Sequence, residues 1–323
     1  MKGGAGMQNT RSDRCCDRSG VTIIEVLVVA GILGLLAALL IPAVQQSRRA
    51  SRRATCQNHL RQIGIGIASI AESTGVFPTS QKPEPAYYRL LPHLDAAAVR
   101  TALLEQRVPE NFQVPTLACP EDAIVTSNMA VGDSSYFFND GIHFRIFEPM
   151  NGFRNSRTRD TRPSDVSDGL SNTVAMAERL VRPLKGGPWT AEIMDREPRR
   201  FLWWTETRYS GRGEEDLAAE NCRNHRTTTY PLHFGANAMN YRLSYGYDHI
   251  LAPNQTGCYN GPEDFDVDVD LILMPASSLH AGGVNVLVAD GSVRFVADGI
   301  DLGVWRALGT RNGNESVAAF PGH

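Results

Sequence analysis

An uncharged apolar run near the N-terminus limits what this chain can fold into more than any other feature. The nineteen residues 26–44 include no charged and no strongly polar side chain. A helix of that length, rising about 1.5 Å per residue, covers about 28 Å, close to the hydrocarbon thickness of a bilayer. A helix in the core of a soluble protein would also need a polar face, which this run lacks. The sequence therefore predicts a membrane-spanning helix.

The remaining composition is that of a folded protein. Of the 323 residues, 42% are hydrophobic and 21% are charged, and the formal net charge is −3. That charge is unevenly distributed: residues 1–61 hold nine basic and three acidic side chains, a net of +6, which leaves −9 for residues 62–323. Because nucleic-acid binders concentrate positive charge on their folded part, we expect no nucleic-acid partner.

The segment before the apolar run carries a specific signature. A short polar leader ends in Gly20 and is followed by Val21-Thr22-Ile23-Ile24-Glu25. This resembles the prepilin signature, which has Gly, an apolar residue (usually Phe), Thr, two aliphatic residues and Glu. The small-x-small cleavage pattern of an ordinary secretory signal does not follow the run. The resemblance implies that prepilin peptidase cuts after Gly20 and methylates the new N-terminus at Val21.

The same resemblance assigns assembly roles to Glu25 and Pro42. An unpaired carboxylate inside an apolar run is costly, so Glu25 should have a partner. In prepilin-like proteins that partner is the N-terminal amine of a neighbouring subunit, which implies other prepilin-like subunits as partners through the N-terminal helix. The alternative is that Glu25 reaches the lipid headgroups. Pro42 resembles the proline that kinks or locally melts the helix of pilins.

Two signals disagree about the side of the membrane on which the folded part lies. The leader has four basic residues and two Asp, whereas Arg48, Arg49, Arg52, Arg53 and Arg61 follow the apolar run with no acid among them. Because basic residues mark the cytoplasmic side, this count favours a cytoplasmic position. The signature favours the periplasm, since the peptidase acts on a cytoplasmic leader. We follow the signature and expect a single pass through the lipid of the bacterial inner membrane.

The pattern predicts an α+β fold in three segments. Residues 1–20 are the leader, and residues 21–73 form one long helix whose membrane span covers about 21–44. Apolar residues recur at helical spacing along this helix up to Ile70, and Gly75 and Pro78 then end it. Residues 75–323 are predicted to form a β-rich head with short helices, facing the periplasm.

Within the head, local signals differ in strength. Residues 185–262 lack periodicity and are predicted to be loops inserted between strands. Residues 284–297 are predicted to form a hairpin around Asp290-Gly291, because this dipeptide favours a tight turn between β-branched runs. After the hairpin, Asp301 is a suitable N-cap for a short helix that Gly309 closes.

The head resembles a large bacterial family of prepilin-like proteins, the domain of unknown function DUF1559. That family has a C-terminal motif of His, nine residues and Asp-Gly, which corresponds here to His280, Asp290 and Gly291. Further matching stretches are CQNHLRQIGIGI (56–67), RLLPHL (89–94), ACPED (118–122), SDGLSNT (167–173) and ALGTRNGNE (307–315). The resemblance implies a protein similar to type II secretion pseudopilins, with the motif residues in structural roles.

A catalytic pair of His280 and Asp290 is disfavoured by geometry. If residues 284–289 form a straight strand at about 3.3 Å per residue, its ends lie about 17–20 Å apart. No nucleophile elbow or metal-ligand spacing accompanies the pair. We therefore expect His280 to be a structural histidine, no residue to be catalytic and the protein not to be an enzyme.

Two groups of acidic residues raise the question of bound calcium. Asp264, Asp266, Asp268 and Asp270 alternate with apolar residues, which would place four carboxylates on one face of a strand, about 7 Å apart. A solvated strand is the preferred interpretation and a Ca²⁺ site is the alternative. Asp165 and Asp168 are ambiguous in the same way, because a turn with Asx hydrogen bonds also explains them. No other cofactor is expected.

Removal of the leader would leave four cysteines, Cys56, Cys119, Cys222 and Cys258. Outside the cytoplasm they would form disulfides, and four cysteines allow three pairings. Cys119 and Cys258 are the preferred pair, because both lie in polar, loop-like sequence. A zinc ribbon is disfavoured since the chain has no C-x-x-C.

Three functions follow, in order of preference. The first is a membrane-anchored structural subunit, a pseudopilin of a type II secretion or type IV pilus-like assembly. The second is a singly anchored cell-envelope binding module that does not polymerise and captures Ca²⁺ or a glycan. The aromatic residues that could stack on a glycan are Trp189, Trp203, Trp204 and Tyr209. Aromatic residues in a β-domain are, however, more often part of the core. The third is a membrane-tethered hydrolase that uses His280 and an Asp.

Overall fold

The structure is a computed structural model that describes residues 22–80, 84–105, 107, 114–122, 134–143, 150–155, 159–180, 196–205, 213–224, 246–260 and 271–315. The chain divides into two compact units, residues 1–48 and residues 49–323. We call them the N-terminal unit and the C-terminal unit and describe each by itself. Their elements combine a long apolar helix with short helices and β-sheets, which confirms the predicted α+β class.

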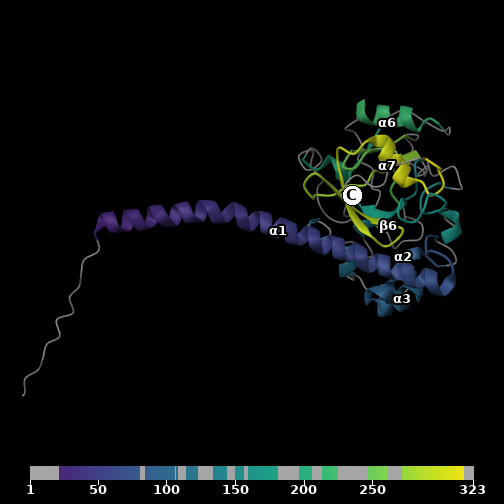
Figure 1. Cartoon of the computed structure of the whole chain (residues 1–323), viewed down its shortest axis with the longest axis horizontal. Helices are drawn as coiled ribbons and strands as arrows, with labels where there is room; N and C mark the ends of the chain where they lie inside the picture. The colour runs from purple at the N-terminus through teal and green to yellow at the C-terminus, as the bar shows by residue number, and fades with distance from the viewer. Residues whose placement is uncertain are drawn as a thin grey trace, which may run out of the picture. The chain divides into compact units, whose positions relative to one another are not determined.

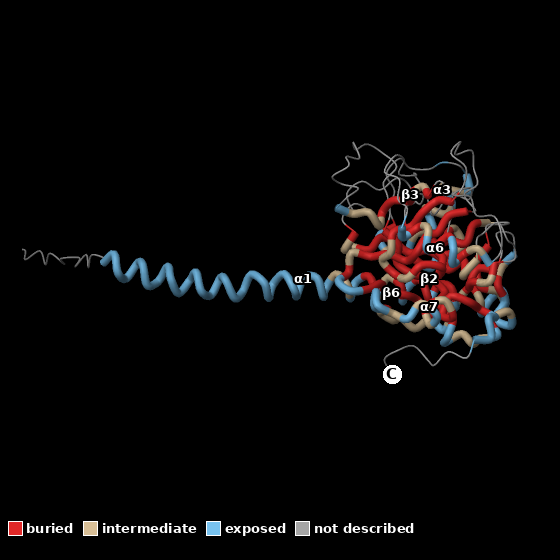
Figure 2. The backbone as a smooth tube through the Cα atoms, turned by 90° about the horizontal axis from the view of Figure 1, so that it is seen from above, coloured by how far each residue is buried: buried red, intermediate tan, exposed pale blue. Residues whose placement is uncertain are grey.

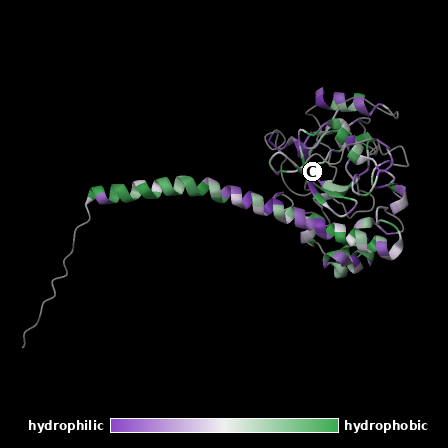
Figure 3. Ribbon diagram, viewed as in Figure 1, coloured by the Kyte–Doolittle hydropathy of each residue, from purple (hydrophilic) through white to green (hydrophobic). Residues whose placement is uncertain are grey.

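Helix α1 (Ile23–Thr74) is a single helix of 52 residues that contributes to both units. Within the N-terminal unit its side chains are exposed, and most of this part of the ribbon has the green colour of hydrophobic residues in Figure 3. Among the described residues, α1 alone is long and apolar enough to cross a membrane. The long helix predicted from the sequence is confirmed, with both ends within two residues of the expected bounds.

Within the C-terminal unit, one face of α1 is buried. Its buried members recur every three or four residues, as expected for a helix packed on a core; they are Cys56, Leu60, Ile63, Ile67 and Ile70, together with two glycines. At Gly64 the helix approaches the sheet closely, because a Cβ there would lie 2.8 Å from Leu287 Cδ1. Figure 2 shows the buried interior of this unit in red.

The main sheet has four antiparallel strands in the order β1 (Tyr136–Phe138), β2 (Val174–Glu178), β6 (Gly283–Val288) and β7 (Val293–Ala297). Strands β6 and β7 form the predicted hairpin. Gly291 in its turn has φ +89°, a left-handed conformation that glycine adopts without steric cost. The core formed by α1 and this sheet places the end of β2 and the start of β6 close to Cys56.

Short helices surround this core. They are α2 (Ala86–Leu90), η1 (Leu91–Leu94), α3 (Ala97–Leu104), η2 (Pro115–Leu117), η3 (Pro163–Asp165), η4 (Pro198–Arg200) and α7 (Leu302–Gly309). The start of α7 is capped as predicted, because the Asp301 side chain accepts a hydrogen bond from the Val304 N–H at 3.0 Å. The same helix buries Trp305 and Leu308 in the main core.

A second sheet corrects the expectation for residues 185–262. In it, β3 (Leu202–Trp204) pairs parallel with β4 (Gly257–Tyr259), which pairs antiparallel with β5 (Ile272–Leu273). Helix α6 (Glu215–Asn224) adds buried side chains to the same region. The region is therefore not only loops. Strands of two or three residues are too short to show a period of two, and their partners are distant in sequence.

Candidate functional site

A covalent bond ties α1 to the rest of the C-terminal unit. Cys56, on the buried face of α1, forms a disulfide with Cys119, which lies just after η2; their Cα atoms are 5.1 Å apart. The second disulfide joins Cys222 of α6 to Cys258 of β4. The predicted pair of Cys119 and Cys258 is therefore wrong. Both residues are buried, and they belong to two different hydrophobic clusters.

Glu178 is a buried carboxylate beside this disulfide. It is the last residue of β2 and only 2% exposed. Its Oε2 accepts a hydrogen bond from the backbone N–H of Asn285 on β6, and its Oε1 accepts one from Asn285 Nδ2, both at 2.8 Å. Gln57 of α1 donates to Asn285 Oδ1 at 3.0 Å. A chain of polar contacts thus joins α1, β6 and β2, as a buried charge requires.

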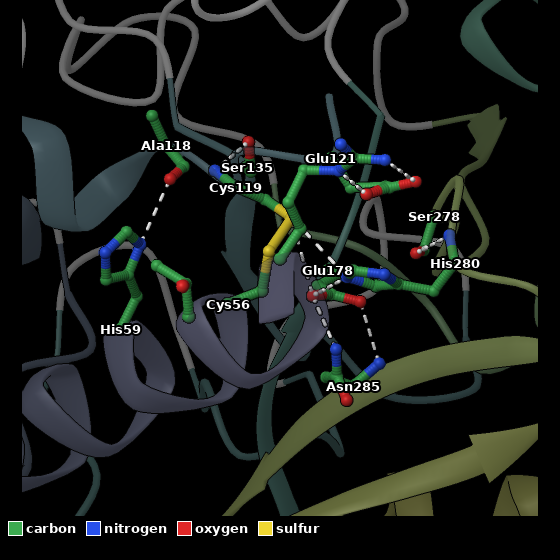
Figure 4. Close-up of a disulfide and its surroundings, with 12 residues drawn as sticks. Cys56, His59, Ala118, Cys119, Glu121, Ser135, Glu178, Ser278, His280 and Asn285 are labelled. Atoms are coloured by element: carbon green, nitrogen blue, oxygen red, sulfur yellow. Dashed lines mark hydrogen bonds and ion pairs between the residues drawn. A yellow bond between two sulfur atoms is a disulfide. The ribbon is translucent and has the colours of Figure 1, made fainter. Parts of the chain in front are cut away.

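His280 completes the cluster. Its Nε2 lies 3.2 Å from Glu178 Oε1 and 3.5 Å from Cys119 Sγ, and its backbone N–H donates to Ser278 Oγ at 2.9 Å. In Figure 4 the imidazole lies against the Glu178 carboxylate, with the disulfide next to both. His280 is 6% exposed, so the pair is shielded from water.

Asp290 has a different role from His280. It lies in the turn between β6 and β7, where its Oδ1 accepts a hydrogen bond from the Ser292 N–H at 2.8 Å. The carboxylate that contacts His280 is Glu178, which sequence reasoning missed. His280 therefore belongs to the buried cluster, whereas Asp290 and Gly291 lie in the turn of the hairpin.

Further contacts position the loop that carries Cys119. The Cys119 N–H donates to Ser135 Oγ at 3.0 Å, and His59 Nδ1 of α1 lies 3.1 Å from the Ala118 carbonyl oxygen. Burial lowers the pKa of His59, although this backbone contact opposes the shift. The neutral imidazole then donates its Nδ1–H to the carbonyl. His59 of α1 thus holds the loop at Ala118, and Ser135, just before β1, holds it at Cys119 (Figure 4).

Glu25 has a local partner at the start of α1. Its carboxylate accepts hydrogen bonds from the Thr22 N–H at 2.9 Å and from Thr22 Oγ1 at 3.0 Å, and the Glu25 N–H donates to Thr22 Oγ1 at 3.3 Å. This reciprocal arrangement has the form of a capping box, a signal carried by the Thr-Ile-Ile-Glu sequence. Gly20 and Val21 lie outside the described residues.

Pro42 lies inside α1, which continues through it, so the local melting considered from the resemblance to pilins is not observed. Proline lacks an N–H, so the carbonyl four residues earlier, that of Ala38, loses its usual helical donor. A helix without a break keeps the remaining backbone groups of the apolar segment paired internally, as a bilayer demands.

The acidic residues considered for calcium have local partners where they are described. Asp165 Oδ2 accepts from the Arg162 N–H at 2.9 Å. The Asp168 carboxylate accepts from the backbone N–H groups of Gly313 at 2.7 Å and Asn314 at 3.0 Å, which fixes the segment after α7. Asn172 Nδ2 donates to the Asp168 carbonyl at 3.0 Å, which adds a local contact within the same turn. Asp264, Asp266, Asp268 and Asp270 lie outside the described residues.

The tryptophans considered for glycan stacking are described only in part. Trp203 on β3 is buried, and its Nε1–H donates to the Pro198 carbonyl at 3.3 Å. Trp204 packs partly buried against Leu202 and its neighbours. Trp189 and Tyr209 lie outside the described residues. The Trp203 ring therefore belongs to the core, in agreement with the preferred interpretation of the sequence.

These observations define a class: a protein with a long N-terminal apolar helix and an α+β unit bonded covalently to that helix. Comparison with known families places it further. A family model described as "Protein of unknown function (DUF1559)" matches residues 45–303, so the chain belongs to this family. No curated protein and no solved structure matches the chain.

Sequence reasoning missed Cys56 as the partner of Cys119, and it missed Glu178 and Asn285 altogether. Weak signals for each were present. Cys56 lies on the apolar face of the predicted helix, and Asn285 is the one polar residue in the run Val-Asn-Val-Leu-Val. A polar residue inside such a buried strand needs a hydrogen-bond partner, but only the fold identifies that partner as Glu178.

Proposed function

We propose that this protein is a prepilin-like, membrane-anchored structural subunit, a pseudopilin of a type II secretion or type IV pilus-like assembly. One observation carries the proposal. Fourteen large apolar side chains between Ile23 and Val44 are between 48% and 80% exposed. An apolar surface of this extent requires lipid or other apolar helices around it.

Processing of the leader supplies the chemistry for assembly. Prepilin peptidase removes residues 1–20 after Gly20 and methylates the amine of Val21. Thr22 gives the Glu25 carboxylate neutral hydrogen-bond donors, which leave its negative charge uncompensated. The positive N-terminal amine of a neighbouring subunit compensates that charge in the apolar phase. Glu25 therefore favours docking of a second copy or of another prepilin-like subunit.

Two features support the proposed side of the membrane. The leader signature requires a cytoplasmic N-terminus, and the C-terminal unit contains two disulfides, which persist in oxidising compartments such as the bacterial periplasm. We therefore place the protein in the bacterial inner membrane as a single pass, with its head in the periplasm. In this role the protein has no catalytic residue.

Co-purification of two differently tagged copies tests the assembly role. Wild-type copies should be recovered together after cross-linking in the membrane and extraction with detergent. Glu25→Leu should reduce that recovery at least about tenfold, since a charge pair in an apolar phase is worth more than 1.4 kcal/mol. Glu72→Gln, an exposed acid near the other end of α1, is the matched control and should behave like wild type.

Both variants must reach the membrane fraction in equal amounts for the comparison to be valid. If Glu25→Leu copies are recovered together as well as wild type, the proposed docking of subunits is wrong. That result would favour a singly anchored binding module instead.

A further inference from the structure

We propose that Cys56, Cys119, Glu178 and His280 form a Zn²⁺ site when the Cys56–Cys119 disulfide is reduced. Nothing in this inference depends on the proposed function. In the oxidised chain, the disulfide joins α1 to the loop that carries Cys119. In the reduced chain, the zinc ion joins the same two segments by binding both sulfurs.

The four side chains provide ligands of the types that zinc prefers. Two thiolates, one imidazole nitrogen and one carboxylate oxygen make a complete tetrahedral set for a structural site. Their ligand atoms all lie within 4.8 Å of one another. Each residue is more than nine-tenths buried, so no position remains open to solvent, as is typical of structural and not catalytic zinc.

The distances in the oxidised structure already approach those of a zinc site. With Zn–S at about 2.3 Å and Zn–N and Zn–O at about 2.0–2.2 Å, a tetrahedron separates unlike ligand atoms by about 3.4–3.6 Å. The corresponding separations are 3.2 Å for His280 Nε2 to Glu178 Oε1, 3.5 Å for His280 Nε2 to Cys119 Sγ and 3.9 Å for Cys119 Sγ to Glu178 Oε1. Once the sulfur–sulfur bond is broken, small side-chain movements complete the site.

The surroundings hold the ligands in place. Asn285 donates two hydrogen bonds to Glu178, and Gln57 in turn holds the Asn285 side chain. Outer contacts of this kind orient carboxylate ligands in metal sites. The second disulfide provides a contrast: within the described part of the chain, Cys222 and Cys258 belong to no such group of ligand-type residues.

The proposed change from a disulfide to a zinc site conserves atoms, electrons and charge. A dithiol reductant donates two electrons and two protons, the Cys56–Cys119 bond breaks to give two thiols, and the reductant becomes a disulfide. Zn²⁺ then binds both sulfurs as thiolates and releases two protons to solvent. With an ionised Glu178 and a neutral His280, the occupied site carries a net charge of −1, close to the Arg53 guanidinium, which interacts electrostatically with Glu178.

Metal analysis of the full chain in detergent tests the proposal. The protein is incubated with Zn²⁺ with and without a phosphine reductant under anaerobic conditions, desalted and analysed by elemental mass spectrometry. We expect one tightly bound zinc ion per reduced chain and none per oxidised chain. With Co²⁺ in place of Zn²⁺, the reduced chain should show thiolate-to-cobalt charge-transfer absorption. A reduced chain without bound metal, or equal binding by the oxidised chain, would overturn the proposal.

Variants identify the ligands. His280→Gln should weaken zinc binding by more than the roughly 10- to 100-fold that loss of an outer contact costs. Two controls should retain zinc: His93→Gln, which alters an exposed histidine outside the ligand set, and Cys222→Ser with Cys258→Ser, which removes the other disulfide. Retention of full zinc affinity by His280→Gln would exclude this site.

A measurement on the wild-type chain covers the case in which His280→Gln fails to fold. The reduced chain is alkylated with and without Zn²⁺, and each cysteine is followed by peptide mass spectrometry. Zinc should slow alkylation of Cys56 and Cys119 and leave Cys222 and Cys258 unaffected. Equal alkylation of all four cysteines with and without zinc would contradict the proposal.

Discussion

His249 shows at the scale of one residue how burial determines a protonation state. Its Nδ1 lies 2.7 Å from the Trp305 carbonyl oxygen and its Nε2 lies 2.8 Å from Tyr247 Oη, while the ring stacks on the Trp305 indole with centroids 3.8 Å apart. A carbonyl only accepts hydrogen bonds, so Nδ1 carries the proton and Nε2 accepts from the tyrosine hydroxyl. Burial lowers the pKa of His249 to about 3, with the Trp305 carbonyl contact opposing the shift.

This pKa predicts an acid-sensitive fold. In the unfolded chain, His249 binds a proton as the pH falls below its ordinary pKa of about 6.5. In the folded chain, His249 binds that proton only as the pH approaches about 3. The stability that His249 contributes is therefore complete above about pH 6.5 and is lost as the pH falls. We expect the free energy of unfolding to decrease by up to about 1.4 kcal/mol per pH unit from this residue alone.

Chemical denaturation between pH 7 and pH 4.5 measures the effect. His249→Gln should flatten the pH dependence across that interval, whereas His93→Gln, which alters an exposed histidine, should leave the wild-type slope unchanged. An identical slope for wild type and His249→Gln would show that burial of His249 does not govern acid stability.

At the scale of elements, the disulfide between α1 and the loop after η2 should contribute strongly to stability. It closes a segment with a sequence separation of 63, for which chain entropy gives a stabilisation of about 4 kcal/mol. Replacing both cysteines, Cys56→Ser with Cys119→Ser, should lower the free energy of unfolding by about that amount. The measurement is chemical denaturation of the oxidised wild-type chain and of this double variant under the same conditions.

The other disulfide is the internal comparison. Its sequence separation is 36. The same relation therefore predicts that Cys222→Ser with Cys258→Ser lowers the free energy of unfolding by about 0.5 kcal/mol less than loss of the first disulfide does. A cost below about 1 kcal/mol for the first pair, together with a larger cost for the second, would contradict the contribution expected of the disulfide between α1 and the loop after η2.

Elements with local signals were predictable and those with distant partners were not. The β6–β7 hairpin, the Asp301 cap and α1 each follow from residues close together in sequence. The parallel pairing of β3 with β4 joins segments more than fifty residues apart and three residues long, so no periodicity identifies it. The same holds for the candidate site. His280 was recognised from its motif, but its contact with Glu178 spans about a hundred residues and depends on strand register.

At the scale of the whole molecule, two properties of the chain follow from α1. Its N-terminal part exposes apolar side chains that water does not tolerate, and its C-terminal part is buried and covalently fixed in the C-terminal unit. The exposed part was predictable because the absence of charge over nineteen residues is a property of the sequence alone. The fixed part was not, because it depends on which cysteine meets Cys56.

The N-terminal mass of protein extracted from membranes is the most direct test of the proposed prepilin-like role. Intact-mass and terminal-peptide spectrometry should find a chain that begins at Val21 with a methylated amine. Gly20→Val, which places a side chain at the cleavage position, should retain all of residues 1–20 and serves as the control. Wild-type protein in the membrane with residues 1–20 still attached would contradict the proposed processing and the docking of Glu25 that depends on it.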